Sequence, residues 1–371
     1  MLALGLLLAI APYVTDVGAT SAEIRWEGDG ELVVGSATIP SIEHDGMHIA
    51  ELSGLAPDRE YGYRVGDEKQ SFRTLPAAGS PVRFAVIGDT RTGNDIHAQL
   101  SAQIAREAPD FVVNTGDLAD DGRVAADWQA FFAAAHPLLS ISALLPVVGN
   151  HDERGLFNAG DWARYFPHRE YAVTAGDVRL IFVDSTVPFE SGTEQHAWIA
   201  AALDDAKAAR ARGEIDWIVA AHHYPVYSSG HHGGDPDVRR ELLPMYCAAG
   251  VDLVLTGHDH IYDRLADGSG ITFVVTGGGG APLYPIHRVP QSVVAQSVHH
   301  WMRFTADHTH LTGEAVDLSG NVIDRFEIEP DHPRASAPAP EPPAARAPLI
   351  AFALIAAAAA AAWIASGKLH A

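Results

Sequence analysis

Five short polar motifs carry residue types that can bind metal ions, and each follows an apolar segment. They are Ile87-Gly88-Asp89, Thr115-Gly116-Asp117, Val148-Gly149-Asn150-His151-Asp152, Ala221-His222-His223-Tyr224-Pro225 and Thr256-Gly257-His258-Asp259-His260. Their carboxylate, amide and imidazole groups suit Zn, Mn or Fe rather than a thiolate site. One Gly-Asp pair is uninformative, and the alternative is a set of turn residues and buried histidines. Five motifs in this order, however, predict a centre for two neighbouring cations.

These motifs fall at the ends of strands in an alternating pattern of strands and helices. From Val82 onward, apolar strands alternate with helices expected at 97–108, 193–212 and 236–249, which predicts an α/β layer architecture. Ligands bind at the carboxyl ends of the strands in such sheets. We therefore expect the five motifs to meet at one edge. Residues 301–328 alternate again and should add terminal antiparallel strands.

The composition limits the class of partner. The chain has 371 residues, with 47 Asp and Glu against 25 Lys and Arg, for a net charge of −22. Nucleic acid is a poor partner for this surface, because its affinity depends on neutralisation of phosphates by Lys and Arg. A small phosphate ester remains compatible if bound cations offset its charge. The single Cys247 excludes an intramolecular disulfide and a zinc site with several thiolates.

Both ends of the chain are predicted to target or anchor it. Residues 1–11 form a hydrophobic start that we interpret as the remaining part of a secretion signal; the alternative is the beginning of the first strand. Residues 330–348 are a Pro- and Ala-rich linker. Residues 349–366 are a candidate transmembrane anchor, with a surface helix as the alternative. With Lys368 inside, the body of the protein would be extracytoplasmic, periplasmic or at the cell surface.

Residues 12–76 predict a small all-β domain. Short alternating segments such as 22–26 and 48–52 are typical of strands. The segment 55–65 contains Tyr61 and Tyr63 and resembles the tyrosine corner of fibronectin- or immunoglobulin-like sandwiches, in which a buried Tyr bonds to upstream backbone. No titratable cluster occurs here, so the expected role of this domain is structural.

The motif series resembles the calcineurin-like metallophosphoesterase superfamily, whose pattern is GD, GD, GNH(E/D), H and GHxH. The resemblance spans about residues 82–328, within the predicted catalytic domain at 80–329. The fibronectin-like domain and the segment 257–264 make the chain similar to the purple acid phosphatase branch in particular. It implies a four-layer α/β/β/α sandwich with two divalent or trivalent metal ions, Fe, Mn or Zn. It also assigns the ligands: Asp117 bridges both metals, one metal takes Asn150, His223 and His258, and the other takes Asp89 and His260. His223 is preferred to His222 because the family ligand lies two residues before a proline.

Two positions depart from the family pattern. The fourth ligand of the Asp89 metal is normally a His two residues after that Asp, or a Tyr three residues after the bridging Asp. This sequence has Arg91 and Asp120 there. Arg91 cannot bind a metal but can clamp a phosphate oxygen. Asp120, or a water in its place, would complete the coordination, so we expect the Asp89 metal to be bound more weakly.

The resemblance implies hydrolysis of small phosphate esters, with monoesters favoured. A metal-activated hydroxide would attack phosphorus while His151 assists the leaving group. Asp152 of the same motif is counted with the catalytic residues, as is His231 of the loop 228–234; His232 is the alternative substrate contact there, and a loop histidine without function is another. The other activities left open are a phosphodiesterase or nucleotidase of the same superfamily and a non-catalytic cell-surface module that binds metal or phosphate. The expected partners are the substrate and, through the C-terminal helix, a membrane.

Overall fold

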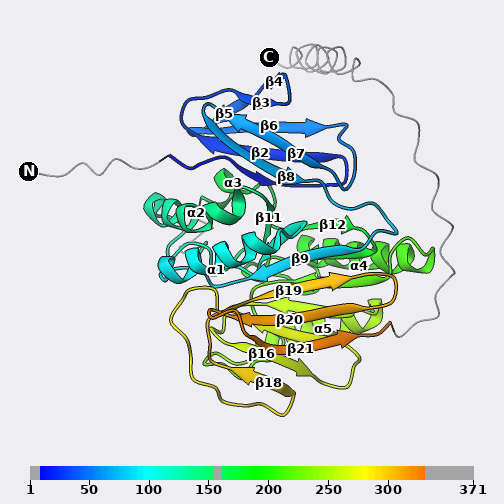
Figure 1. Ribbon diagram of the computed structural model, residues 1–371. Helices are drawn as coiled ribbons and strands as arrows, with labels where there is room; N and C mark the ends of the chain where they lie inside the picture. The colour runs from blue at the N-terminus through cyan, green and yellow to red at the C-terminus, as the bar shows by residue number, and fades with distance from the viewer. Residues whose placement is uncertain (1–8, 154–160, 331–371) are drawn as a thin grey trace, which may run out of the picture. The chain divides into compact units, whose positions relative to one another are not determined.

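The computed structural model describes residues 9–153 and 161–330 (Figure 1). Its N-terminal part is two antiparallel four-stranded sheets. The first has the order β1 (Tyr13–Thr15), β2 (Ser21–Glu27), β6 (Met47–Ser53), β5 (Ile42–His44), and the second β4 (Ala37–Ile39), β3 (Leu32–Val34), β7 (Glu60–Val65), β8 (Glu68–Arg73). Trp26 and Ile24 of the first sheet share one buried cluster with Leu32 and Phe72 of the second. The predicted all-β architecture is therefore confirmed.

The tyrosine corner differs from the expectation in one respect. The Ala56 N–H donates to the Tyr61 hydroxyl at 2.8 Å, which is the expected bond to upstream backbone. However, Tyr61 is only half-buried. The buried residue is Tyr63, whose hydroxyl donates to Gln70 Oε1 at 2.6 Å.

Two larger sheets follow, and the candidate metal-binding motifs lie at their strand ends. The six-stranded sheet has the order β11 (Ala143–Pro146), β10 (Phe111–Asn114), β9 (Val82–Ile87), β19 (His300–Ala306), β20 (Leu311–Asp317), β21 (Val322–Ile328). The seven-stranded sheet has the order β12 (Tyr171–Ala175), β13 (Val178–Phe182), β14 (Trp217–Ala221), β15 (Leu253–Thr256), β17 (Thr272–Thr276), β16 (Tyr262–Ala266), β18 (Ser292–Gln296). β9, β10 and β11 are parallel to one another, as are β13, β14, β15 and β17. The terminal strands β19, β20 and β21 are antiparallel, as predicted.

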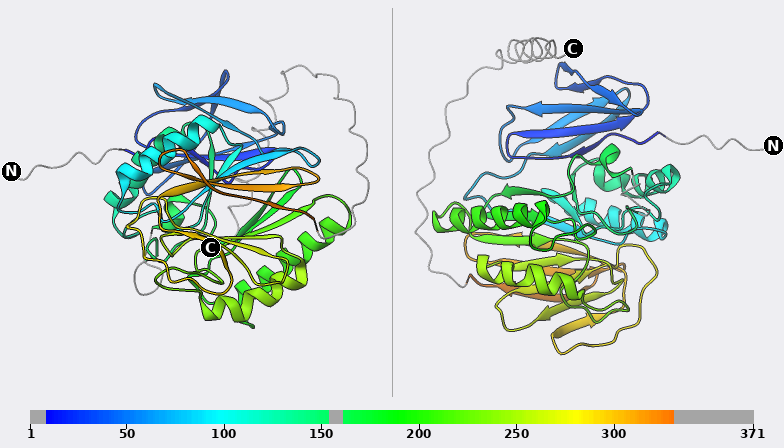
Figure 2. Two further views of the ribbon diagram at one scale, coloured as in Figure 1. Left: turned by 60° about the horizontal axis from the view of Figure 1, so that its bottom comes forward. Right: turned by 180° about the vertical axis from the view of Figure 1, so that it is seen from behind.

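Alternate residues along the central strands separate the hydrophobic core into layers. In β9, Phe84 and Val86 belong to the cluster that also holds Val219 of β14, so the two sheets pack face to face. Ala85 and Ile87 face the other way, into a cluster with α1 (Asn94–Glu107) and α2 (Ala125–Leu139). The outer face of the seven-stranded sheet packs in the same way against α4 (Glu194–Ala211) and α5 (Pro236–Ala249). The layers are therefore α/β/β/α, as predicted, and Figures 1 and 2 show these helices around the sheets.

Helix α5 begins and ends at local capping signals. At the start of α5 the Asp235 carboxylate accepts the N–H groups of Asp237 and Val238, and Pro236 follows as the first helical residue. At its end Gly250 has a φ of 71°. Helix α2 and the short helix α3 (Trp162–Tyr165) were not among the helices named from the sequence. The proposed boundaries at 12–76 and 80–329 remain predictions.

The predicted terminal segments fall largely outside the described residues. This applies to the anchor at 349–366 and to the linker beyond Pro330. Ile10, inside the predicted hydrophobic start, is buried and exchanges two hydrogen bonds with Glu27, so the folded part includes it. In residues 9–153 and 161–330, no helix combines the length and the hydropathy that a bilayer crossing requires. The anchor and the extracytoplasmic location therefore remain predictions.

Candidate metal centre

The loops that follow the parallel strands hold the candidate ligands in a constrained backbone. Asp89, Asp117 and His258 all have positive φ angles, of 54°, 57° and 70°. Side chains other than glycine rarely adopt this conformation, and such strain is concentrated at functional sites. The neighbouring chain is also close: a Cβ on Gly149 would lie 2.1 Å from the Asp117 nitrogen, and one on Gly257 would lie 2.4 Å from Asp89 Oδ2. Glycine is therefore required where these loops meet.

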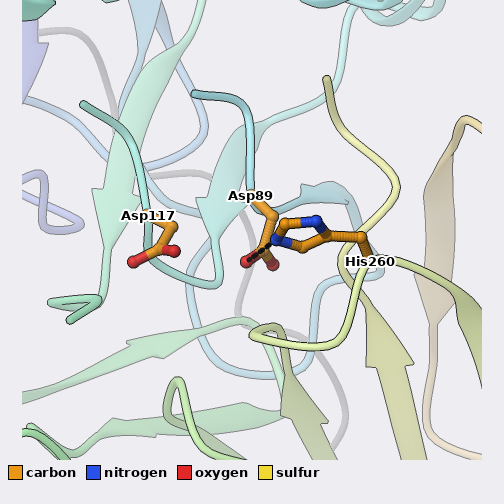
Figure 3. A group of neighbouring side chains, drawn as sticks. All are labelled: Asp89, Asp117 and His260. Atoms are coloured by element: carbon orange, nitrogen blue, oxygen red, sulfur yellow. Dashed lines mark ion pairs between the residues drawn. The ribbon is translucent and has the colours of Figure 1, made fainter. Parts of the chain in front are cut away.

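Asp89, Asp117 and His260 form one group of potential metal ligands (Figure 3). Their ligand atoms lie within 4.8 Å of one another, and all three residues are buried. His260 Nδ1 lies 2.7 Å from the Pro282 carbonyl, which can only accept, so Nδ1 carries the hydrogen. The lone pair is then on Nε2, which lies 3.6 Å from Asp89 Oδ1. An imidazole oriented by a backbone carbonyl in this way is typical of a metal ligand.

A second group shares Asp117 with the first. His223 Nε2 lies 3.1 Å from Asn150 Oδ1 and 3.3 Å from Asp117 Oδ1, while its Nδ1 donates to the Thr115 carbonyl at 2.8 Å. The His258 ring lies 5.1 Å from the His223 ring. His222 points away, with its ring against Tyr246 in the core behind the sheet. The structure thus brings His223, rather than His222, to the candidate centre.

The electrostatics of the centre favour bound cations. Burial and the neighbouring Asp117 carboxylate raise the pKa of Asp89 well above its usual value. Burial would also raise the pKa of Asp117, but His223, His151 and Arg91 lower it to about 2. Burial lowers the pKa of His260 to about 4, so its imidazole is neutral at pH 7 and can bind a metal. Buried carboxylates that repel each other beside neutral imidazoles fit a site for cations with oxygen and nitrogen ligands.

Arg91 lies against this centre. Its guanidinium contacts Asp117 Oδ2 through Nε at 3.0 Å, Asp120 Oδ1 through Nη1 at 3.3 Å and His260 Nε2 through Nη2 at 3.5 Å. The Asp120 side chain is 45% exposed and is not part of the group formed by Asp89, Asp117 and His260. Its side chain contacts Arg91 and also His151, whose Nδ1 lies 3.6 Å from Asp120 Oδ1. Asp120 as the fourth ligand therefore remains a prediction.

His151 lies beside Asp117 without joining either ligand group. Its backbone N–H donates to Asp117 Oδ1 at 2.9 Å, and its Nδ1 lies 2.7 Å from the Asp120 carbonyl. Because that carbonyl only accepts, Nδ1 keeps its hydrogen, and the proton that His151 gains or loses is on Nε2. Nε2 lies 3.9 Å from Asp117 Oδ2 and so faces the centre.

Asp152 has a different role from the catalytic one expected. Its side chain is fully buried, and Oδ1 accepts the N–H groups of Leu118 and Ala119 at 2.9 and 3.0 Å. Oδ2 accepts those of Asp117 and Gly149 at 3.0 and 2.9 Å. Both oxygens are thus engaged by backbone. Asp152 positions the loops that carry Asp117 and Asn150 and does not reach the reacting groups.

The loop 228–234 approaches the centre with His232 instead of the expected His231. The His232 ring is stacked on His258 with centroids 4.3 Å apart, whereas the nearest rings to His231 are those of His232 and Tyr284. Asp259 anchors the loop by accepting the His232 and Gly233 N–H groups. Both histidines are exposed.

Tyr284 was not anticipated from the sequence. It stacks on His260 with centroids 4.1 Å apart. It follows His260 at a spacing that matches no motif, so no sequence signal could have identified it. Asp259, in contrast, is the variable residue of the GHxH motif and could have been examined as a loop anchor.

The chain is similar to known phosphoesterases. Residues 82–262 match the calcineurin-like phosphoesterase family model. Purple acid phosphatase 18 of Arabidopsis thaliana is 26% identical over 301 residues, which is 75% of this chain and 64% of that protein. An uncharacterized protein of Mycobacterium tuberculosis is 30% identical over 267 residues, 58% of this chain and 50% of its own. The chain thus spans half to two thirds of these relatives.

A solved structure shows the same fold. The purple acid phosphatase PPD1 from yellow lupin (Lupinus luteus) seeds superposes with a TM-score of 0.75 at 22% identity, covering 86% of this chain and 74% of that one. The resemblance inferred from the motifs and the predicted fold class are both confirmed.

Proposed function

We propose that this protein is a metal-dependent hydrolase of small phosphate esters, with monoesters preferred. The match of residues 82–262 to the calcineurin-like phosphoesterase family model and the similarity to purple acid phosphatases support this proposal. The observation that carries the proposal is the shared carboxylate of Asp117. It lies within reach of Asp89 and His260 on one side and 3.3 Å from His223 Nε2 on the other. One carboxylate between two ligand sets is the arrangement that a dinuclear centre requires.

The candidate ligands form two groups, one for each cation position. Asp89, Asp117 and His260 would hold one cation, and Asp117, Asn150, His223 and His258 the other. When bound, such cations supply Lewis acidity: they offset the negative charge of the ester and lower the pKa of a coordinated water. The absence of thiolates leaves Fe, Mn and Zn as the candidate metals.

His151 is the group placed to move a proton. Its Nδ1–H is held by the Asp120 carbonyl, which fixes the ring and leaves Nε2 facing the centre. Protonated at Nε2, His151 can donate that proton to the leaving oxygen as the phosphorus–oxygen bond breaks. The His151 N–H bond to Asp117 Oδ1 ties this acid to the shared carboxylate, so its position follows that of the centre.

The test is hydrolysis of p-nitrophenyl phosphate and bis-p-nitrophenyl phosphate by the full chain, stripped of metal and then reloaded with Mn, Zn or Fe(II). We expect activity only after reloading, with the monoester cleaved faster. Asp117→Asn should lose bound metal and activity together, whereas Asp317→Asn, in an exposed turn, should match the wild type. A protein that binds metal but hydrolyses neither ester would instead be a binding module.

A further inference from the structure

Arg91 contacts the same atoms that a cation at the Asp89 position would need. Its Nε lies 3.0 Å from Asp117 Oδ2, and its Nη2 lies 3.5 Å from His260 Nε2. Asp117 and His260 both belong to the candidate ligand group that includes Asp89. The guanidinium is therefore placed as a competitor of the metal, not merely as a neighbour.

The chemistry of these two atoms makes the competition direct. His260 Nδ1 carries the hydrogen that it donates to the Pro282 carbonyl, so Nε2 has the only lone pair of the ring. That lone pair can accept an N–H from Arg91 or bind a cation, but not both. On Asp117, Oδ1 already accepts the His151 N–H and faces His223, so Oδ2 is the oxygen directed to the Asp89 side.

The guanidinium is well suited to occupy this place. A guanidinium offers several N–H donors in a rigid plane. Its side chain is only 13% exposed, and its backbone is held because the Arg91 N–H donates to the Asp117 carbonyl at 3.3 Å. At His223, in contrast, Nε2 faces Asn150 Oδ1 and Asp117 Oδ1, and the described structure places no guanidinium against it.

Asp120 gives the guanidinium a second partner away from the ligands. Arg91 Nη1 lies 3.3 Å from Asp120 Oδ1, and the Asp120 side chain is 45% exposed. If a metal takes Asp117 Oδ2 and His260 Nε2, Arg91 can keep Asp120 and turn outward. The two positions that depart from the family pattern are thus paired with each other.

We propose that Arg91 is an internal competitor for the Asp89-side cation, with Asp120 as the partner that receives the displaced guanidinium. The centre then binds its two metals with unequal affinity, first on the side of Asn150, His223 and His258, and second on the side of Asp89 and His260. This inference rests on the proposed function only for the existence of the metal centre. Metal affinity, not catalysis, is what it predicts.

In the first experiment, the metal-stripped full chain is titrated with Mn²⁺ or Zn²⁺. Calorimetry measures the binding steps, and elemental analysis measures the number of metal ions bound. Wild type should show two binding steps. Arg91→Ala should tighten the second step by about 10- to 100-fold, the range of one hydrogen bond to a charged group, and leave the first unchanged. Arg91→Lys should tighten it less, since the charge remains. Arg264→Ala is the control, because Arg264 is similarly buried (19% exposed) but pairs with Asp324.

A double-mutant cycle separates this role of Asp120 from metal ligation. Asp120→Asn should weaken the second metal more in the wild type than in Arg91→Ala, because Asp120 is the one partner of the three that Arg91 keeps after a metal takes Asp117 Oδ2 and His260 Nε2. Equal weakening in both backgrounds would make Asp120 a ligand and overturn the proposal. So would an Arg91→Ala variant with unchanged or weaker second affinity.

Failure of the proposed function is distinguishable from failure of this inference. Two unequal metal sites with the predicted Arg91 response, but no ester hydrolysis, would support the inference and remove the function. A wild type that binds no metal would overturn both.

Discussion

Replacing Asp152 by Asn tests whether this buried carboxylate positions the metal-binding loops. Its four acceptor contacts are to the N–H groups of Leu118, Ala119, Asp117 and Gly149. In the Asp152→Asn variant one oxygen becomes an NH₂ group, so two of these buried donors lose their acceptor whichever way the amide turns. Each unsatisfied donor costs about 1–3 kcal/mol, or roughly 2–6 kcal/mol for the pair.

Part of this loss is offset. Burial and the nearby Asp117 carboxylate raise the pKa of Asp152, so removal of its charge relieves some repulsion. We therefore expect a net loss near the lower end, about 2–3 kcal/mol in the free energy of unfolding. The loop of Asp117 should also shift, and both metals should bind more weakly.

The assay is urea unfolding of the metal-free protein, with metal content measured separately. Asp317→Asn is a matched control, since its carboxylate also accepts backbone N–H groups but in an exposed turn, where water can replace it. It should lose less than about 1 kcal/mol. If Asp152→Asn kept wild-type stability and metal content but lost kcat, the positioning argument would be refuted and a catalytic role restored.

Three further predictions concern the proton donor, the iron spectrum and acid stability. His151→Ala should keep both metals but lower kcat by about 10²- to 10⁴-fold, with a smaller loss for good leaving groups; an equal loss across a leaving-group series would contradict this. Iron-loaded, air-oxidised protein should lack a strong visible charge-transfer band. Asp120 stands where the family has its tyrosine ligand, and the Tyr262 hydroxyl is engaged because it donates to Asp324 at 2.6 Å. A strong band that disappears in Tyr262→Phe would refute this and identify Tyr262 as an iron ligand. Burial lowers the pKa of His97 to about 3 and that of His300 to about 4, below the usual 6.5. Both side chains are therefore neutral in the folded protein at a pH where the unfolded chain protonates them. Their contribution to the free energy of unfolding is full above pH 6.5 and is lost as the pH falls below it. Together, His97 and His300 should lower the free energy of unfolding by about 4 kcal/mol between pH 7.5 and pH 5, as measured by urea unfolding. His97→Phe should show a smaller change in this free energy with pH. An unchanged pH dependence would exclude His97 as a contributor.

Local signals in the sequence predicted the central strands, the helices α1, α4 and α5, and the residue types at the strand ends, but not α2 or α3. Apolar runs buried on both faces predicted the central strands, because such strands cannot alternate with polar residues. Asp235, Pro236 and Gly250 predicted the limits of α5, because caps act within a few residues. The order of the polar motifs predicted the ligand types, which remain a prediction, and the family resemblance and fold, which the comparisons confirmed.

The roles of Asp152, His232 and Tyr284 could not be predicted in this way. Asp152 is adjacent to His151 in the sequence, yet its carboxylate accepts backbone N–H groups of the loop that begins at Asp117. Tyr284 reaches His260 only because the chain after β17 returns over the site. Such contacts depend on the direction in which a loop leaves the sheet, which no local spacing encodes.

Arg91 and Asp120 show most clearly what the sequence determined and what only the tertiary structure decided. The sequence alone determined that neither residue type matches the family's ligand at its position, since residue identity can be compared one place at a time. Only the tertiary structure decided that these two residues contact each other, and that Arg91 also contacts Asp117 and His260. The physical reason is that pairing of β9 with β10, and packing of their sheet against the one that contains β15, bring together loops that are far apart along the chain.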